Sequence, residues 1–240
     1  SPCPMMLLAV RSLSGAEGPQ WSPDGRTIAF TSSLGGASEI WGADPESGLL
    51  NQITVGMGGV GHLAAALTQW SPDGRMLAFV SAKSGTDEVW LWRDDTPGLR
   101  QLTRLGGRVE AISWSPDSSA LAVASNARGT FDIYRVEVGD GATRRLTADA
   151  RYEVYPSFTP DGKQILYVRL SAGWTDHEVV RIDAVDGSDP RVILEDQNFF
   201  DYHYGRTFGA PQVSPDGRFF LFRSHRSGWS CRLWRRPPWP

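Results

Sequence analysis

The stretch Trp70-Ser71-Pro72-Asp73-Gly74, with the run Met76-Leu77-Ala78-Phe79-Val80 after it, decides the fold because the chain repeats this pattern five times. Proline presets φ at the second turn position, Asp suits the third, and glycine closes a type I turn. Each copy therefore predicts the tip of a hairpin. The five turns begin at Ser22, Ser71, Ser115, Thr159 and Ser214. These positions lie 49, 44, 44 and 55 residues apart, a period typical of small units that bury their apolar faces by stacking.

The residues around each turn predict four strands per unit. Each turn follows an aromatic or apolar residue: Trp21, Trp70, Trp114, Phe158 and Val213. Each turn precedes a short aromatic and aliphatic run, at residues 27–30, 76–80, 120–123, 164–168 and 219–222. A third run opens with an acidic residue in four copies, at Glu39, Glu88, Asp132 and Glu178. A more polar fourth run occupies residues 51–54, 100–103, 144–147 and 191–194. Buried inner strands with a polar outer edge are typical of propeller blades.

We therefore predict an all-β fold, a β-propeller of four-stranded antiparallel blades with about five blades visible. The prediction places one propeller domain over residues 1–240, with units near 15–55, 64–104, 108–148, 152–195 and 208–236. Residues 5–13 stand where the fourth strand of a preceding blade would stand. Such a strand could seal a ring of five blades. We favour the alternative that this is a truncated part of a six- to eight-bladed propeller.

Composition and motifs exclude several classes of function. The formal net charge is −3, which gives no field to attract nucleic acid. No apolar stretch is long enough for a membrane span. The sequence has no zinc-ligand spacing, no phosphate-binding glycine loop with a lysine and no acidic calcium loop, so we expect no metal and no cofactor. Two cysteines, Cys3 and Cys231, leave the compartment open between cytoplasm, periplasm and secretion, with the cytoplasm favoured.

With these motifs in place, residues 15–235 resemble the β-propeller repeats shared by the TolB protein and the N-terminal domain of prolyl-oligopeptidase-type serine peptidases. The hairpin Phe222-Arg223-Ser224-His225-Arg226-Ser227-Gly228-Trp229 resembles one in dipeptidyl-peptidase-like propellers. The resemblance implies a C-terminal α/β-hydrolase domain in the parent protein and a peptide as substrate. This chain departs from the family pattern at Ser230-Cys231-Arg232, which puts that domain in doubt.

The chain itself carries no recognisable catalytic triad. A serine peptidase of this type needs a Gly-x-Ser-x-Gly elbow between a strand and a helix. The nearest sequence, Gly228-Trp229-Ser230-Cys231-Arg232, lacks the closing glycine. We therefore expect no hydrolase domain within these residues.

Candidate binding residues fall in two places. The insertion between the fourth and fifth units carries Asp201, Tyr202, His203 and Arg206 among aromatic residues, and loops on a rigid scaffold often bind ligands. The alternative is that its aromatic residues pack against a blade edge. The second set, which precedes innermost strands and could reach the channel mouth, comprises Glu110, Tyr152, Glu153 and Tyr155.

From the second set we retain Glu153 as a substrate-binding candidate. The segment Tyr152-Glu153-Val154 does not reproduce the acidic motif with which dipeptidyl-peptidase-like propellers hold a substrate's amino terminus. The acidic residues that open the third strands recur too regularly to form a site, and we expect them to cap blade turns or to make hydrogen bonds between blades.

The repeats and the resemblance together lead to two candidate functions. The first is a non-catalytic propeller that gates and orients peptide substrates for a serine peptidase domain outside this chain. The alternative is a TolB-like propeller of the cell envelope that binds a protein partner.

Overall fold

The computed structural model describes residues 16–57, 67–96, 98–171, 176–197, 210–217, 219–223 and 231–235. Nineteen strands lie in these ranges, which contain no α-helix. They form four sheets of four strands and one of three, each with its strands in chain order. The all-β prediction and the four-stranded antiparallel blade are thereby confirmed. Within the described residues, no helix is long and apolar enough to cross a membrane.

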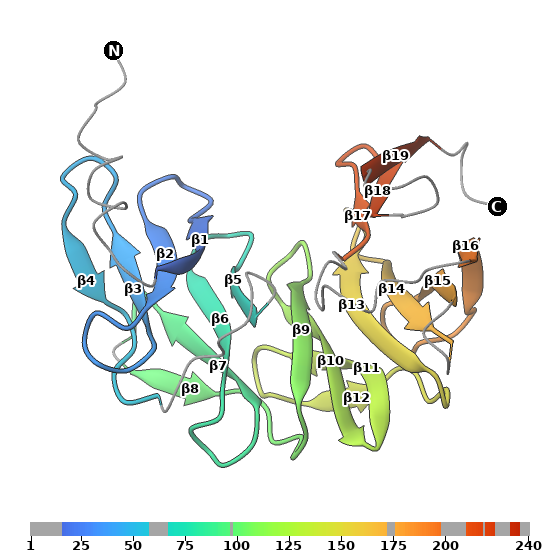
Figure 1. Cartoon of the computed structure of the whole chain (residues 1–240), viewed down its shortest axis with the longest axis horizontal. Coiled ribbons are helices and arrows are strands. Elements are labelled where there is room, and N and C mark those ends of the chain that lie inside the picture. Colours follow the sequence, from blue (N-terminus) through green and yellow to red (C-terminus); the bar gives the residue numbers. More distant parts are fainter. Residues whose placement is uncertain are drawn as a thin grey trace. The chain divides into compact units, whose positions relative to one another are not determined.

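The chain divides into two compact units, Ser1–Val109 and Glu110–Pro240. In the first unit, blade 1 consists of β1 (Glu17–Trp21), β2 (Ile28–Ser32), β3 (Glu39–Ala43) and β4 (Leu50–Gln52). Blade 2 consists of β5 (Thr68–Trp70), β6 (Met76–Ser81), β7 (Glu88–Arg93) and β8 (Leu99–Gln101). Figure 1 shows each of these sheets as an antiparallel meander.

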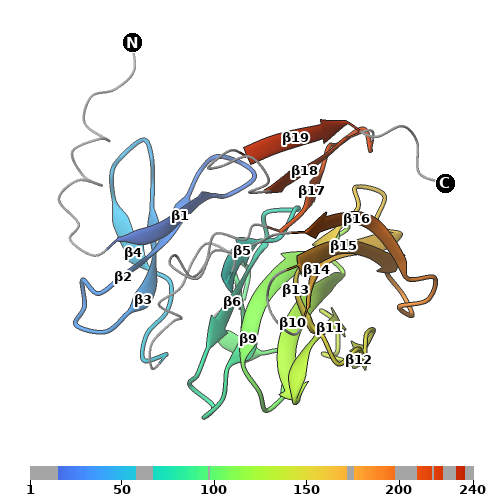
Figure 2. The same ribbon diagram turned by 45° about the vertical axis from the view of Figure 1, so that its right-hand side comes forward.

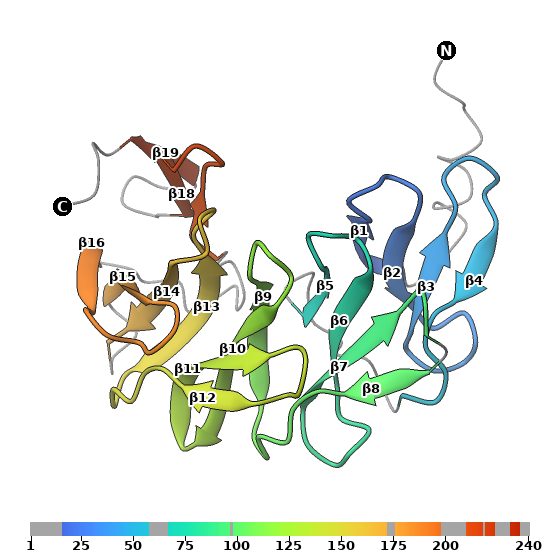
Figure 3. The same cartoon turned by 180° about the vertical axis from the view of Figure 1, so that it is seen from behind.

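In the second unit, blade 3 consists of β9 (Val109–Trp114), β10 (Ala120–Arg128), β11 (Thr130–Glu137) and β12 (Thr143–Arg145). Blade 4 consists of β13 (Tyr152–Phe158), β14 (Gln164–Leu170), β15 (Asp176–Asp183) and β16 (Arg191–Gln197). The last sheet contains β17 (Gln212–Val213), β18 (Phe219–Arg223) and β19 (Cys231–Arg235). Strand β13 packs against β10 and β11 of blade 3 (Figure 3), and β14 to β16 follow it side by side (Figure 2).

The repeated turn is held by the side chains that define it. In the first copy, Ser22 Oγ donates to Asp24 Oδ1 at 2.6 Å and accepts from Thr27 N at 2.9 Å. Gly25 N donates to Ser22 O at 2.9 Å, with Gly25 at a φ of 73°. The same hydroxyl-to-carboxylate bond recurs at 2.6 Å in the other four turns. Only the third copy places a serine, Ser118, in the left-handed conformation, with a φ of 61°.

The outer strands differ from the prediction at their C-terminal ends. In blades 1 to 3 the predicted run ends with an apolar residue and a threonine, but the strand stops two residues earlier; β4 ends at Gln52, before Ile53 and Thr54. In blade 4, β16 instead continues past Leu194 to Gln197. Ile53 and Thr54 both donate their backbone N–H to Ile40 O, at 2.9 and 3.2 Å. Ile53 is buried. The chain therefore turns inward here, because burying the isoleucine against the sheet is more favourable than continuing an exposed edge strand.

Each unit has a core formed between neighbouring blades. In the first unit, Ala29, Ile40 and Ile53 of blade 1 cluster with Met57 and with Leu77 and Phe79 of blade 2. In the second unit, one cluster joins apolar residues of β10 and β11 to those of β13, β14 and β15. The ring centroids of Phe131 and Tyr152 lie 4.7 Å apart across this contact. Both faces of a blade are thus apolar, as the sequence predicted for stacked sheets.

Candidate site in blade 4

The acidic residue that opens the third strand has a structural role in blades 1 and 2. Glu39 Oε2 accepts from Thr54 Oγ1 at 2.5 Å, and Glu39 Oε1 accepts from Met57 N at 3.0 Å. In blade 2, Glu88 accepts from Thr103 Oγ1 at 2.6 Å and from two backbone N–H groups of the following connector, both at 2.9 Å. Both glutamates are buried. We call this arrangement the glutamate–threonine clamp; it confirms the structural role predicted for these two residues.

Blade 3 departs from this arrangement. Its acidic residue is Asp132, one methylene shorter than glutamate, and its buried Oδ2 lies 2.8 Å from Arg145 Nη2. Thr147 Oγ1 still accepts from Ile133 N at 2.9 Å. The Thr147 hydroxyl is hydrogen-bonded to Glu153 of β13 instead of to the acidic residue of its own blade.

Blade 4 departs further. Leu194 stands after the buried Ile193, where a threonine follows the buried residue in the other blades, so Glu178 has no threonine partner there. Glu178 Oε2 instead accepts from Arg169 Nη2 at 2.5 Å and Nε at 2.8 Å, and from Arg151 Nη1 at 3.3 Å. The clamp has been replaced by ion pairs.

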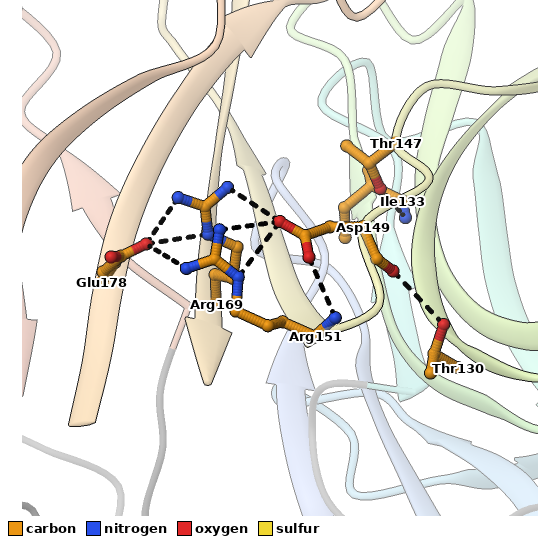
Figure 4. Close-up of polar contacts among 7 residues, drawn as sticks. All are labelled: Thr130, Ile133, Thr147, Asp149, Arg151, Arg169 and Glu178. Atoms are coloured by element: carbon orange, nitrogen blue, oxygen red, sulfur yellow. Dashed lines mark hydrogen bonds and ion pairs between the residues drawn. The ribbon is translucent and has the colours of Figure 1, made fainter. Parts of the chain in front are cut away.

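A second carboxylate completes this group. Asp149 Oδ2 accepts from Arg151 Nη2 at 2.7 Å and from Arg169 Nη1 at 3.3 Å. Each carboxylate therefore bridges both guanidinium groups, as Figure 4 shows. We call Asp149, Arg151, Arg169 and Glu178 the ion cluster. The hydrogen bond from Arg151 is the main cause that lowers the pKa of the Asp149 carboxyl. Arg151 and Asp149 are 38% and 30% exposed at their side chains, whereas Arg169 is 13% exposed.

Arg169 occupies a position that holds serine in every other four-stranded blade. In the sheet register, Arg169 pairs with Glu178, as Ser32 pairs with Glu39 and Ser81 with Glu88. Ser125 takes the same place opposite the acidic residue of blade 3. All three serines are buried. A guanidinium in this row is specific to blade 4.

Glu153 is a second substitution of this kind. It stands five positions before the residue that precedes the turn, where the first three units have Ala16, Ala65 and Val109. Its exposed fraction is 1%. Burial raises the pKa of Glu153 to about 7, against the opposing effect of hydrogen bonds from Thr147 and Tyr167. Among the residues that the structure describes, no donor reaches Glu153 Oε2.

Tyr167 is the third residue of blade 4 that departs from the pattern of the repeat. It lies where blades 1 and 2 have Phe30 and Phe79, so blade 4 adds a hydroxyl at this core position. That hydroxyl is bonded to Glu153, and burial raises the pKa of Tyr167. Positions where a chain breaks its own structural pattern are the positions at which function is expected. Blade 4 departs from the pattern at Glu153, Tyr167 and Arg169, which are charged or polar where most other blades have serine or an apolar residue.

The sequence-predicted site residues have different outcomes. Asp201, Tyr202, His203 and Arg206 lie outside the described residues. Glu153 lies in the contact between blades 3 and 4, where it is buried. Its role in substrate binding stays a prediction. Glu110, Tyr152 and Tyr155 are half-buried.

The ion cluster was not predicted from the sequence. An alignment of the repeat units would have indicated it, because Arg169 stands where the first three units have serine and Leu194 where they have threonine. The cluster has both signs of charge at a partly exposed position, which suits contact with a polar or charged segment of another molecule. Within the described ranges, no three His, Cys, Asp or Glu side chains are placed to hold a metal ion.

The sheets define the class of protein: stacked four-stranded antiparallel meanders, each closed by the same turn, are blades of a β-propeller. The model of the TolB beta propeller domain matches residues 61–231, and the chain belongs to this family. This match confirms the resemblance found from the repeated turn. A comparison with curated proteins gave no match.

Solved structures include propellers from both branches of that resemblance. TolB from Acinetobacter baumannii has a TM-score of 0.66 and 23% identity, over 88% of this chain and 49% of that protein. A putative TolB from Agrobacterium tumefaciens has a TM-score of 0.63 and 24% identity, over 86% and 69%. Dipeptidyl peptidase 4 from Porphyromonas gingivalis has a TM-score of 0.64 and 17% identity, over 92% and 38%. At these identities the likeness concerns the fold. The chain spans about half of the first TolB.

Proposed function

We propose that this chain is a non-catalytic propeller that binds peptides and orients them for a serine peptidase domain outside these residues. The observation that carries the proposal is that, in blade 4, the ion cluster takes the place of the glutamate–threonine clamp, and Glu153 stands at a position that is apolar in the first three units. These charges do not serve the clamp that blades 1 and 2 use. Arg169 replaces the buried serine of the other blades, and Asp149 and Arg151 join it from the connector around the recurrent acid Glu178.

The character of the ion cluster supports a peptide as ligand. A peptide backbone offers carbonyl oxygens to guanidinium groups and N–H groups to carboxylates, and its termini carry both charges. Arg151 is the most exposed member and can exchange a partner with a ligand at modest cost, because exposed ion pairs contribute little net free energy. Arg169 is held by two acids and keeps the cluster in place.

The similarity to a dipeptidyl peptidase 4 propeller favours peptide gating. The family match and the similarity to two TolB structures favour the alternative, a propeller that binds a folded protein partner in the cell envelope. The two functions differ in the ligand that the ion cluster should contact: a short flexible peptide in the first, and the surface of a folded protein in the second.

Calorimetric titration of the purified chain with synthetic five-residue peptides with free termini tests the proposal. Arg169→Ser restores the residue of the other blades and should weaken peptide binding by about tenfold, the scale of one charge-assisted contact. Arg191→Ser is the matched control. It removes an arginine from the outer strand of the same blade, where Arg191 is exposed and pairs only at the surface with Asp189.

The control should bind peptides as the unchanged chain does. Equal affinities for both variants, or no peptide binding by the unchanged chain, would contradict the proposal. In the second case, selective retention of a folded protein from cell-envelope extract, lost in R169S and kept in R191S, would favour the alternative.

A further inference from the structure

Glu153 is an acid buried at a position that is apolar in the first three units. Its exposed fraction is 1%, and Oε2 has no hydrogen-bond donor among the described residues. Thr147 and Tyr167 supply hydroxyl donors to the carboxyl group. A neutral carboxylic acid tolerates this setting, but a buried carboxylate with an unpaired oxygen is costly. Ionisation of Glu153 therefore favours the approach of a cation to Oε2.

Charged groups lie around Glu153 on the strands and the connector near β13; β10, which also packs against β13, carries one charged residue, Arg128 at its end. Two are acids that oppose its ionisation, Asp132 on β11 and Asp149 on the connector between β12 and β13. Two arginines respond to its charge, Arg145 on β12 and Arg151 on the same connector. Arg169 is its register partner on β14, and Glu178 is the next residue in that row.

Of these cations, Arg151 is the one that can move at least cost. Arg145 pairs with Asp132, whose side chain has no exposed surface, and its departure would leave a buried charge unpaired. Arg169 is mostly buried and bonds to both acids of the ion cluster. The Arg151 side chain is 38% exposed. If Arg151 moves away, Asp149 and Glu178 both remain paired with Arg169.

The backbone also places Arg151 within reach. Arg151 stands on the connector two residues before Glu153, directly before the first residue of β13. Its two acid partners are shared with Arg169, which pairs with Glu153 in the sheet register. A rotation of the arginine side chain can therefore exchange partners without a change in the sheet.

We propose that Glu153 is a proton-controlled latch: when it releases its proton to solvent, Arg151 leaves Asp149 and Glu178 and pairs with Glu153 Oε2. In the protonated state Arg151 returns to the ion cluster. Ionisation thus leaves Arg169 as the one cation between Asp149 and Glu178, and the exposed part of the cluster becomes more acidic. The pKa of Glu153, raised by burial to about 7, places this exchange near neutral pH.

Nuclear magnetic resonance of the intact chain between pH 5.5 and 8.5 tests the latch. The Glu153 side-chain carboxyl carbon should titrate with a midpoint near 7, and the Arg151 Nε–H signal should shift with the same midpoint. The Arg191 signal should not follow it, and Arg145, which stays paired with Asp132, should shift less than Arg151. In Glu153→Gln, which keeps an acceptor for both hydroxyl groups but cannot ionise, the Arg151 shift should disappear.

An Arg151 signal that stays constant across this range, or moves identically in E153Q, would overturn the latch. The wild-type titration decides this even if the variant does not fold. Control of peptide affinity by the latch rests on the proposed function: binding of the five-residue peptides should change about tenfold across the range in the unchanged chain and stay constant in E153Q. A titrating latch with constant peptide affinity would reject the peptide site and retain the latch.

Discussion

Glu153→Gln should change how the stability of the Glu110–Pro240 unit depends on pH. The unfolded chain has the ordinary glutamate pKa of 4.5, whereas the folded chain has a pKa of about 7 for this group. Between these values the folded state holds a proton that the unfolded state has released. The free energy of unfolding therefore falls as pH rises through this window, and it is flat above pH 7 and below pH 4.5 as far as this group is concerned.

The magnitude follows from the two pKa values. Each pH unit within the window corresponds to about 1.4 kcal/mol for one proton. Integrated from pH 5 to pH 8, the loss is about 2.5 kcal/mol, and pairing with Arg151 would recover part of it. Glutamine has no proton to release, so the variant lacks this loss.

Urea denaturation at pH 5, 6, 7 and 8, followed by circular dichroism and tryptophan fluorescence, measures the effect. The quantity to compare is the difference in unfolding free energy between the wild type and E153Q at each pH. Carboxyl groups with a lowered pKa, such as Asp117 at about 2, act on both proteins equally and cancel. The variant should gain up to about 2.5 kcal/mol relative to the wild type between pH 5 and pH 8. A difference that is constant with pH would refute the assignment of a buried, proton-binding Glu153.

Two further predictions concern the scaffold. Gly187→Ala should lower the free energy of unfolding by about 3 kcal/mol or more, because a Cβ there would overlap the backbone carbonyl oxygen of Leu146 at a φ of 76°. Gly48→Ala, in the related turn of blade 1 with open space around it and a φ of 71°, should cost only about 1 kcal/mol; equal melting-temperature losses would contradict the steric argument. Glu88→Ala should cost about 3 kcal/mol, since it removes the acceptor of Thr103 Oγ1 and of two backbone N–H groups. Chemical denaturation checks this, and a loss below about 1 kcal/mol, the scale of a single hydrogen bond, would show that the clamp is not needed for stability.

Much of the fold was predictable because its signals are local. The Ser-Pro-Asp-Gly turn is stabilised by bonds between residues two to five positions apart, such as Ser22 to Asp24 and Thr27. The apolar runs have the length and composition of strands that are buried on both faces. These features depend on backbone stereochemistry and on side-chain pattern, so they can be recognised before any tertiary contact is known.

The ends of the outer strands were less predictable. The β-prone residues Ile53 and Thr54 follow Gln52 in the sequence, but the chain leaves the strand there. The choice depends on whether Ile53 can be buried against a neighbouring sheet, which is a tertiary contact. Local propensity alone therefore placed the boundary too late.

By itself, the sequence determined the recurrent hairpins, the all-β class and the propeller family, because turn geometry and short apolar runs act over a few residues. Only the tertiary structure decided that Arg169 and Glu178 pair in register, that Asp149 and Arg151 join them from the connector, and that Glu153 is enclosed by Thr147 and Tyr167. These groups come from separate strands, and their distances are set by sheet register and blade packing. Their electrostatics follow from that enclosure, since burial raises the pKa of Glu153 while the same residue on a solvent-exposed strand would be an ordinary carboxylate.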